Sequence, residues 1–464
     1  MENVKKDAMY YLEKAPIPKA IAHMAIPMIL GMVVNMIYNI TDAYFIGKLE
    51  STSMLASITL ALPFTTVLMA LGEIFGTGGS TYISRLLGEK NMDRVKKASS
   101  VNFYLSLISG IVFMLICLPA LPPVLKLLGA RGETLLYTRD FIFAYALGSP
   151  FVIANFTLAQ MVRGEGAATE SMIGMIISVA ANIILDPVFI FLFHMDVMGA
   201  SVATVIGNVC AVAYYIYYLK RKSAVQSISI KDFKPTGEII FNIFKIGISA
   251  FLLSGFLIVS SLMFNNYAVM YGDHVVAAFG VANRVCQISD FIGMGLYMGV
   301  VPLIAFSYAS NNIERLNKVL KTTALYLVSI ILAIAVALFI FRIQILELFS
   351  SDEAVIKVGV TILSALLLST LFAGISGLLT SMFQAFGKGF QSNIMSVSRG
   401  VALIPIIIIG NFLFQLNGVI WSMATSEICA CLIGLFLWLT TKKDIMEMAA
   451  LGQDDSDEFQ NSSY

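Results

Sequence analysis

Pro27-Met-Ile-Leu-Gly-Met-Val-Val-Asn-Met-Ile-Tyr-Asn-Ile-Thr-Asp-Ala-Tyr-Phe-Ile-Gly47 is the stretch that decides the fold. It is long and apolar enough to cross the hydrocarbon core of a bilayer, which takes about 20 residues of helix. It nevertheless contains a carboxylate, Asp42, close in sequence to Asn35, Asn39 and Thr41. A charge at membrane depth costs about 2.5 kcal/mol or more unless it is paired, hydrated or protonated, so Asp42 is a candidate functional group. The alternative is that Asp42 lies just outside the hydrocarbon and ends the helix.

The composition of the whole chain indicates a polytopic membrane protein. Of its 464 residues, 58% are hydrophobic and 13% are charged, whereas about 25% are charged in a soluble domain. The mean hydropathy is +0.84. The net charge of +1 argues against a nucleic-acid partner, because nothing would compensate the phosphates. We therefore expect an all-α protein whose surroundings are the lipid bilayer.

Apolar runs of about 20 residues predict twelve transmembrane helices. The predicted spans are residues 21–46, 54–82, 99–121, 137–162, 171–193, 198–219, 240–269, 276–307, 319–342, 355–383, 393–414 and 418–440. An even number places both termini on one side, and most of the 30 Lys and Arg residues fall in segments on that side. Because positive residues concentrate in the cytoplasm, we expect a multi-pass plasma-membrane protein with both termini cytoplasmic.

The sequence repeats itself at an offset of about 220 residues. The segment 86–97 and its following span match the segment 311–321 and the span after it, Gly166 matches Gly387, and Gly199 matches Gly418. Six helices per repeat give both repeats the same orientation, so they predict two lobes related by a pseudo-twofold axis along the membrane normal. The expected divisions are a cytoplasmic N-terminus (1–20), an N-lobe (21–219), a cytoplasmic connector (220–237), a C-lobe (238–441) and a cytoplasmic, partly disordered tail (442–464).

Four polar side chains of the N-lobe are expected at one depth. With a rise of about 1.5 Å per residue, Asp42 lies about 6 Å, Thr204 about 9 Å and Asp186 about 10 Å from the outer ends of their spans, and Asn182 lies one turn from Asp186 on the same face. Carboxylate, amide and hydroxyl oxygens suit Na⁺, and paired acids suit a proton. The alternatives remain that Asn182 and Thr204 only link helices, and that Asp186 with Pro187 only forms a kink.

Other polar groups inside the spans are candidates for a substrate pathway. They are Asn35, Asn39, Glu73, Arg284 and Asp290. Glu73 lies in the inner half of its span and has the alternative of extending toward the cytoplasm. Arg284 and Asp290 are six residues apart on one helix, so direct pairing is not expected, and each has the alternative of bonding to another helix. Gln384 and Arg399 are interpreted as groups at helix ends near the inner surface.

Several motifs together resemble one transporter family. They are Tyr44-Phe-Ile-Gly47, Gly79-Ser-Thr-Tyr-Ile-Ser-Arg-Leu-Leu-Gly88, Leu128-Gly-Ala-Arg-Gly-Glu133, Asn182-Ile-Ile-Leu-Asp-Pro187, Gly247-Ile248, Gly299-Val-Val-Pro-Leu-Ile-Ala305 and Gly418-Val-Ile-Trp-Ser422. The chain resembles the MATE (multidrug and toxic compound extrusion) transporters, and within them the MepA-like branch. The resemblance implies a V-shaped, twelve-helix, two-lobe antiporter that expels organic cations against entry of Na⁺ or H⁺.

The resemblance also implies site residues. The first-lobe cation site of the family matches Asp42, Asn182, Asp186 and Thr204. Members close to MepA can lack an acid at the position of Asp42. In the NorM-like branch an acid of the seventh or tenth span binds the coupling ion, and here neither span contains one, so Asp290 is the nearby candidate in the second lobe.

The expected function is secondary active multidrug efflux, in which lipophilic or cationic organic compounds leave against Na⁺ or H⁺ by alternating access. We expect a monomer that is not an enzyme, because no hydrolytic arrangement is visible, with no cofactor besides the coupling ion and with a possible Na⁺ at the N-lobe residues. One alternative is a lipid-linked oligosaccharide flippase of the same superfamily, which would need several cationic residues in its cleft. The other is a non-transporting membrane receptor or a membrane-embedded enzyme.

Overall fold

The computed structural model describes residues 9–48, 51–350 and 352–461, and at 39, 43, 46 and 444–461 it describes the backbone alone. The first half contains α2 (Ile17–Gly47), α3 (Thr52–Gly88), α4 (Met92–Cys117), α5 (Leu121–Leu127), α6 (Gly132–Leu147), α7 (Ser149–Gly164), α8 (Ala168–Pro187), the π-helical η1 (Val188–Leu192) and α9 (Asp196–Arg221). The connector contains the short 3₁₀-helix η2 (Ile230–Asp232). The second half contains α10 (Gly237–Val269), α11 (Asp273–Gly299), α12 (Val301–Ala309), α13 (Ile313–Ile340), α14 (Arg342–Phe349), α15 (Glu353–Ala385), α16 (Gly389–Val401) and α17 (Leu403–Asn461).

These helices form the twelve spans that the sequence predicts. Ten stretches of the described residues are long and apolar enough to cross a bilayer, and α6 with α7, bent by 56°, forms another. The stretch from Gly389 to Lys443 contains two spans, because α17 reverses at Gln415, whose φ of 52° is not helical. Eight residues of straight helix would separate Gly410 and Gly418 by about 12 Å. A Cβ added to Gly418 would instead lie 1.9 Å from the carbonyl oxygen of Gly410, so the two arms of α17 pack against each other.

The internal repeat is visible in how helices begin and end. Lys90 and Asn311, which are 221 positions apart, both have positive φ, at 57° and 54°. The next residue in each repeat, Asn91 or Asn312, caps the following helix by accepting a hydrogen bond from the backbone N–H of Arg94 or Arg315. An Asn cap satisfies one of the amides that a helix start leaves without an intrahelical partner. The same local chemistry thus starts the third span of each lobe.

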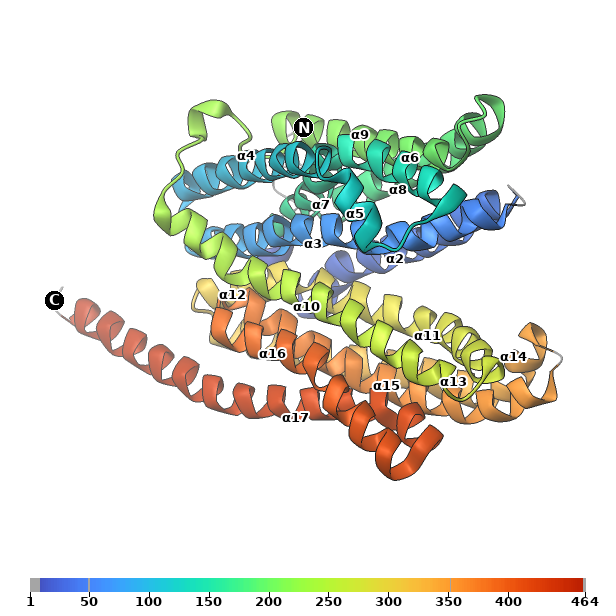
Figure 1. Cartoon of the computed structure of the whole chain (residues 1–464). Helices are drawn as coiled ribbons and strands as arrows, with labels where there is room; N and C mark the ends of the chain where they lie inside the picture. Colours follow the sequence, from blue (N-terminus) through green and yellow to red (C-terminus); the bar gives the residue numbers. More distant parts are fainter. Residues whose placement is uncertain (1–8, 49–50, 351, 462–464) are drawn as a thin grey trace.

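The two halves of the chain pack as two lobes, drawn above and below one another in Figure 1. Between the lobes, α3 packs against α10 and α12, and α2 packs against α11. Glycines permit the closest approach: a Cβ at Gly78 would lie 2.1 Å from the carbonyl oxygen of Ile243, and one at Gly247 would lie 2.2 Å from that of Ile74. We call the end of the bundle where the connector lies the connector end, and the opposite end the far end.

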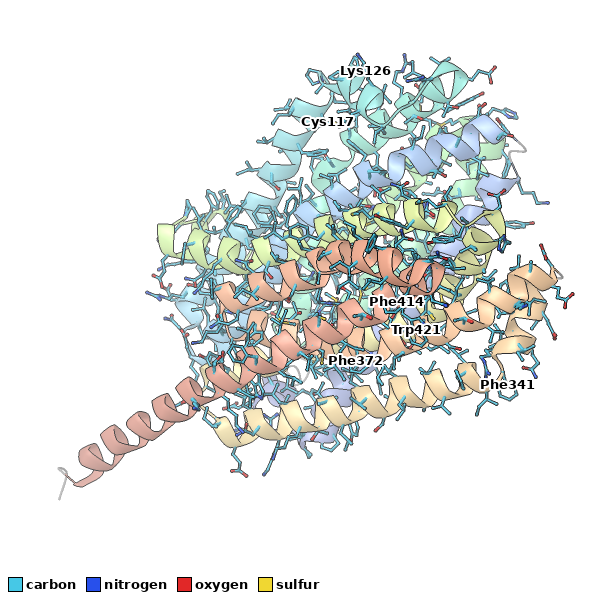
Figure 2. All side chains as sticks on the ribbon, turned by 60° about the horizontal axis from the view of Figure 1, so that its bottom comes forward. Cys117, Lys126, Phe341, Phe372, Phe414 and Trp421 are labelled. Atoms are coloured by element: carbon cyan, nitrogen blue, oxygen red, sulfur yellow. The ribbon has the colours of Figure 1, made fainter. Side chains whose placement is uncertain are left out.

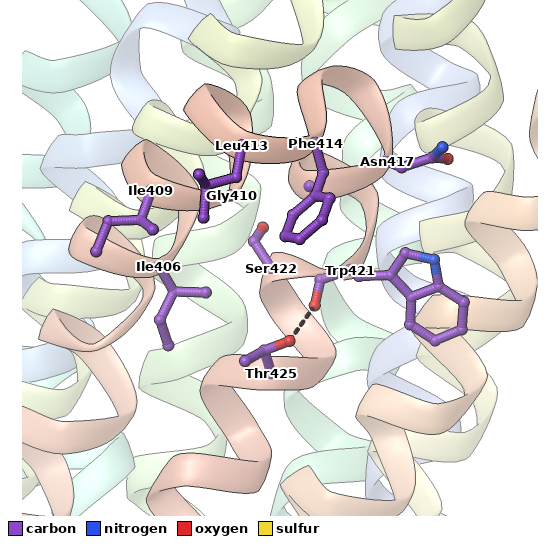
Figure 3. A pocket seen from close by; sticks show the side chains of 10 residues that line it. Ile406, Ile409, Gly410, Leu413, Phe414, Asn417, Trp421, Ser422 and Thr425 are labelled. Atoms are coloured by element: carbon purple, nitrogen blue, oxygen red, sulfur yellow. Dashed lines mark hydrogen bonds between the residues drawn. The ribbon is translucent and has the colours of Figure 1, made fainter.

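The outer surface of the bundle is apolar. Figure 2 shows Phe414 and Trp421 on the outside of α17, where 67% and 41% of these residues are exposed. Between the two arms of α17 lies a hollow of about 550 Å³, which Figure 3 shows with the hydrogen bond from Thr425 Oγ1 to the carbonyl oxygen of Trp421. Since α17 packs against α15 and α16 of its own lobe, this hollow is a feature of the lipid-facing surface and not of the interface between the lobes.

Candidate functional site

Asp186 lies where the geometry of its helix changes. The α-helical geometry of α8 ends at Pro187 and changes to the π-helical turn η1. Proline has no N–H to continue the ladder, and single π-turns are frequent at functional sites. Asp186 is fully buried at this transition, and Asn182 lies one turn earlier on the same face, also buried.

Asn182, Asp186 and Thr204 form one hydrogen-bonded group. With the Asn182 amide turned as the network favours, its nitrogen donates to Asp186 Oδ2 at 2.9 Å and its oxygen accepts from Thr204 Oγ1 at 3.0 Å and from the Thr204 amide at 3.1 Å. Tyr38 of α2 reaches the group, with its hydroxyl 3.4 Å from Thr204 Oγ1. The structure therefore brings α2, α8 and α9 together at one level of the N-lobe, and it adds Tyr38, which the sequence analysis did not select.

Asp42 lies on α2 one turn beyond Tyr38 and is partly buried. Its carboxylate is close enough to Asp186 and Tyr38 to interact electrostatically with both. The group thus offers carboxylate, amide and hydroxyl oxygens, which are ligands for a hard cation or acceptors for a proton. We call Tyr38, Asp42, Asn182, Asp186 and Thr204 the N-lobe cluster.

The two asparagines of α2 lie toward the connector end from Asp42. Asn35 is two turns from Asp42 on the same helix face, and it is partly buried. The backbone of Asn39 is part of α2, but its side chain lies outside the described residues. Asn35 does not line the cavity between the lobes described next.

A cavity of about 470 Å³ lies between the lobes. The N-lobe contributes Glu73 and Thr77 of α3 to its wall, and the C-lobe contributes apolar side chains such as Leu257 and Met294. Glu73 Oε2 accepts hydrogen bonds from Thr77 Oγ1 and from Gln160 Nε2, both at 2.7 Å. These bonds hold the Glu73 carboxylate at the cavity wall, which is the placement expected for a pathway residue rather than for a side chain that extends to the helix end.

The C-lobe wall of this cavity contains a charged group that the sequence analysis missed. Arg399 Nη2 of α16 lies 3.4 Å from Glu427 Oε1 of α17, and both side chains are mostly buried. Glu427 Oε2 accepts a hydrogen bond of 2.6 Å from Ser376 Oγ of α15. Arg399 lies in the last turn of α16, so its interpretation as a helix-end group holds. Its expected place near the inner surface was wrong, because this turn is half a span from the connector end and Arg399 lines the cavity. Glu427 could have been found as Asp42 was, as an isolated acid inside an apolar span.

Asp290 and Arg284 of α11 have different environments. Asp290 lines the cavity beside Arg399 and Glu427. Arg284 is exposed and is not part of the cavity wall. The structure therefore brings Glu73 and Asp290 together at one cavity and leaves Arg284 apart from them.

Two helical lobes around a shared cavity, built from helices that are long and apolar enough to span a bilayer, define a multi-pass membrane transporter. The comparisons with known proteins agree with this class. The chain belongs to the MATE family, whose model (MatE) matches residues 27–188 and 246–413. This confirms the family predicted from the sequence motifs.

Relatives match the chain over nearly its whole length. It is 41% identical over 437 residues to the "Multidrug export protein MepA" of Staphylococcus aureus (strain MRSA252), covering 94% of this chain and 97% of that protein. It is 39% identical to the protein of the same name from Staphylococcus saprophyticus, covering 97% and 99%. A solved structure described as the "outward-facing conformation of a multidrug resistance MATE family transporter of the MOP superfamily" matches with a TM-score of 0.88 at 25% identity, covering 96% and 99%.

Proposed function

We propose that the protein is a secondary active multidrug efflux transporter of the plasma membrane, which exchanges lipophilic organic cations for Na⁺ or H⁺. The observation that carries the proposal is the cavity between the lobes, whose wall combines apolar side chains with the carboxylates of Glu73 and Asp290. Flexible methionine side chains such as Met294 can adapt to unlike apolar molecules, and the carboxylates attract a positive charge. The similarity to two multidrug export proteins supports the same substrate class.

The charge of the connector end supports a proposed orientation of the lobes in the membrane. Arg85, Arg94 and Arg315 make hydrogen bonds between the lobes at the connector end. The positive charge of this end argues that it is cytoplasmic. With that orientation, the lobes are closed toward the cytoplasm, which is the outward-facing arrangement named for the matching solved structure.

The N-lobe cluster would supply the coupling to the ion. A Na⁺ or H⁺ that enters from outside at Asp42 and Asp186 removes negative charge and changes how α2 packs against α8 and α9. A ligand shifts the equilibrium between two orientations only by its difference in affinity for them. Ion and drug therefore favour opposite orientations in the proposed cycle, and the cycle needs no cofactor besides the ion.

The test is efflux in proteoliposomes with Na⁺ and pH gradients imposed separately. Asp42→Asn and Asp186→Asn should each reduce ion-driven ethidium efflux by at least about tenfold, because each removes a charge that binds the ion. Binding of ethidium to the purified variants is the control for folding. Undiminished efflux in both variants contradicts the assignment of the N-lobe cluster, whereas wild-type protein without efflux under either gradient contradicts the transport function.

A further inference from the structure

Two lysines of the C-lobe lie close together near the connector end, where α10 and α16 pack against each other (Figure 1). A Cβ added to Gly389, the first residue of α16, would lie 2.5 Å from Cγ and 3.2 Å from Cε of Lys245. The Lys245 side chain of α10 therefore extends across the start of α16. Lys388 precedes Gly389 directly, so the missing side chain at position 389 permits two positive side chains to share one place on the surface.

Lys245 points away from the N-lobe. The backbone of α10 contacts α3 closely at Ile243 and at Gly247, two residues before and two residues after Lys245. Because two residues turn an α-helix by about 200°, Lys245 lies on the opposite side of α10 from these contacts. It is exposed there, on the side of the helix that faces α16 and the lipid.

Two exposed aromatic side chains flank the lysines. Phe241 lies one turn before Lys245 on α10 and is 65% exposed, and Phe390 follows Gly389 on α16 and is 74% exposed. Lys245 Nζ lies 5.9 Å from the centre of the Phe241 ring. Apolar rings of this exposure suit contact with lipid, and a lysine beside them places its charged end at the level of the headgroups while its stem packs on apolar surface.

The positive charge of the two lysines is not compensated within the part of the chain that the structure describes. Neither Lys245 nor Lys388 forms an ion pair there. Glu238, two turns before Lys245 on the same side of α10, is paired with Arg94 of the N-lobe. Lys245 also lies eight residues after Gly237, where α10 begins, within a helix that is apolar enough to span a bilayer. Two like charges at this depth repel each other, so a negatively charged group between them would stabilise the arrangement.

We propose that Lys245 and Lys388 bind the phosphate of an anionic phospholipid from the leaflet at the connector end, with Phe241 and Phe390 against the upper part of its acyl chains. Basic sites between transmembrane helices recognise anionic headgroups by charge complementarity. A zwitterionic phospholipid fits less well, because its own cationic group is repelled by the lysines. The site belongs to the C-lobe alone, since the internal repeat that matches Gly166 with Gly387 places Ala167 at the position of Lys388.

One of the two tryptophans of the chain can report on this site. The ring of Trp438 on α17 lies 6.2 Å, between centroids, from the ring of Phe386, which is two residues before Lys388. In the variant Trp421→Phe, Trp438 is the only tryptophan. The full-length protein is reconstituted into mixtures of phosphatidylglycerol, which is anionic, and phosphatidylcholine, which is zwitterionic, with one of the two brominated near the headgroup. Bromine quenches tryptophan fluorescence on contact, so the two quenching curves give the relative association constant of the two lipids.

We expect phosphatidylglycerol to associate more strongly than phosphatidylcholine. Lys245→Gln and Lys388→Gln should each lower this preference about fivefold, the effect of one lysine near an anionic membrane surface. Lys245→Arg retains the charge and should retain the preference. Lys321→Gln is the matched control, because Lys321 is exposed and lies eight residues after the start of α13, as Lys245 does on α10, but α13 packs against α11 and α15. It should leave the preference unchanged.

Three results would overturn the proposal. Equal association of the two lipids with the chain that has both lysines would show that no anionic lipid is selected. An equal loss of preference in Lys321→Gln and Lys245→Gln would assign the selection to the general positive charge of the connector end. Loss of the preference on addition of inorganic phosphate, with sodium chloride at the same ionic strength as the reference, would show that the lysines bind a soluble anion instead of a lipid.

Discussion

Glu165 is a buried carboxyl group in the turn between α7 and α8 at the connector end. Tyr218 Oη donates to its Oε1 at 2.6 Å and Ser223 Oγ donates to its Oε2 at 2.7 Å. Burial raises the pKa of Glu165 to about 7, more than these hydrogen bonds lower it. The charged groups nearby are Glu170 and Lys222, which pair with each other at 3.2 Å. The protonation of Glu165 should therefore make the free energy of unfolding depend on pH.

The sign of this linkage follows from the raised pKa. The folded protein binds the proton of Glu165 more tightly than the unfolded chain does. Protonated Glu165 therefore contributes its full stabilisation below its ordinary pKa of about 4.5, and this stabilisation is lost as the pH rises through about 7. The loss is roughly 3 kcal/mol, at about 1.4 kcal/mol per pKa unit. The melting temperature of Glu165→Gln minus that of wild type should be larger at pH 8 than at pH 5. Thermal unfolding in detergent measures this difference. A difference between variant and wild type that is equal at both pH values would contradict this.

The grouping of Asn182, Asp186 and Thr204 was predictable from the sequence because it depends on quantities that a sequence contains, whereas the contact of Tyr38 with Thr204 was not. The rise per residue fixes depth, and the spacing of Asn182 and Asp186 fixes a shared helix face. The pairing of Arg399 with Glu427 in the C-lobe was not predictable in the same way. The environment of Arg399 depends on Glu427, which reaches it from α17, and no spacing along one helix reveals which of its neighbours supplies a counter-charge.

At the scale of the elements, the number and order of spans were predictable, but their breaks were not. The sequence predicts continuous helices at 137–162 and 276–307, whereas the structure divides them at Gly148 and Val300. In both cases a proline, Pro150 or Pro302, stands at the start of the second piece, where its missing N–H costs nothing. Whether a proline bends a helix or begins a new one depends on packing by other helices, which the local sequence does not contain.

The reversal of α17 provides a test at this scale. Gly418→Ala places a methyl group 1.9 Å from the carbonyl oxygen of Gly410, so the two arms must separate. Gly255→Ala on α10 is the matched control, because nothing lies within 4 Å of its added methyl, and alanine is favoured over glycine in a helix by about 1 kcal/mol. We expect Gly418→Ala to lower the melting temperature of the purified protein and Gly255→Ala to maintain or raise it. Equal melting temperatures for the two variants would show that the arms are not tightly packed.

At the scale of the whole molecule, the two lobes are linked at the connector end by arginines that the internal repeat places at equivalent positions. Arg94 begins the third span of the N-lobe and contacts Glu238, at the start of α10, at 2.9 Å. Arg315 begins the third span of the C-lobe and donates to the carbonyl oxygens of Tyr11, Leu12 and Ala15, before α2, at 3.0, 3.1 and 2.9 Å. Each lobe thus reaches across to the segment that leads into the first helix of the other.

The two links should differ in strength. Arg94 and Glu238 form an exposed ion pair, which contributes about 0–1 kcal/mol. Arg315 is partly buried and makes three charge-assisted bonds, and the loss of such bonds costs about 1.5–3 kcal/mol each before relaxation. Arg315→Gln should therefore shift the lobes toward the arrangement that is open at the connector end, whereas Arg94→Gln should have little effect.

Spin labels at Lys96→Cys and Lys321→Cys, both exposed at the connector end of opposite lobes, allow this shift to be measured in a background without the five native cysteines. Double electron–electron resonance should give Arg315→Gln a larger population of long distances than wild type, and Arg94→Gln should match wild type. Drug efflux should be slower in Arg315→Gln than in wild type, because an equilibrium moved too far toward one orientation slows turnover. Substrate binding should remain intact. An unchanged distance distribution in Arg315→Gln would mean that the glycine contacts of α3 with α10, and not the arginines, keep this end closed.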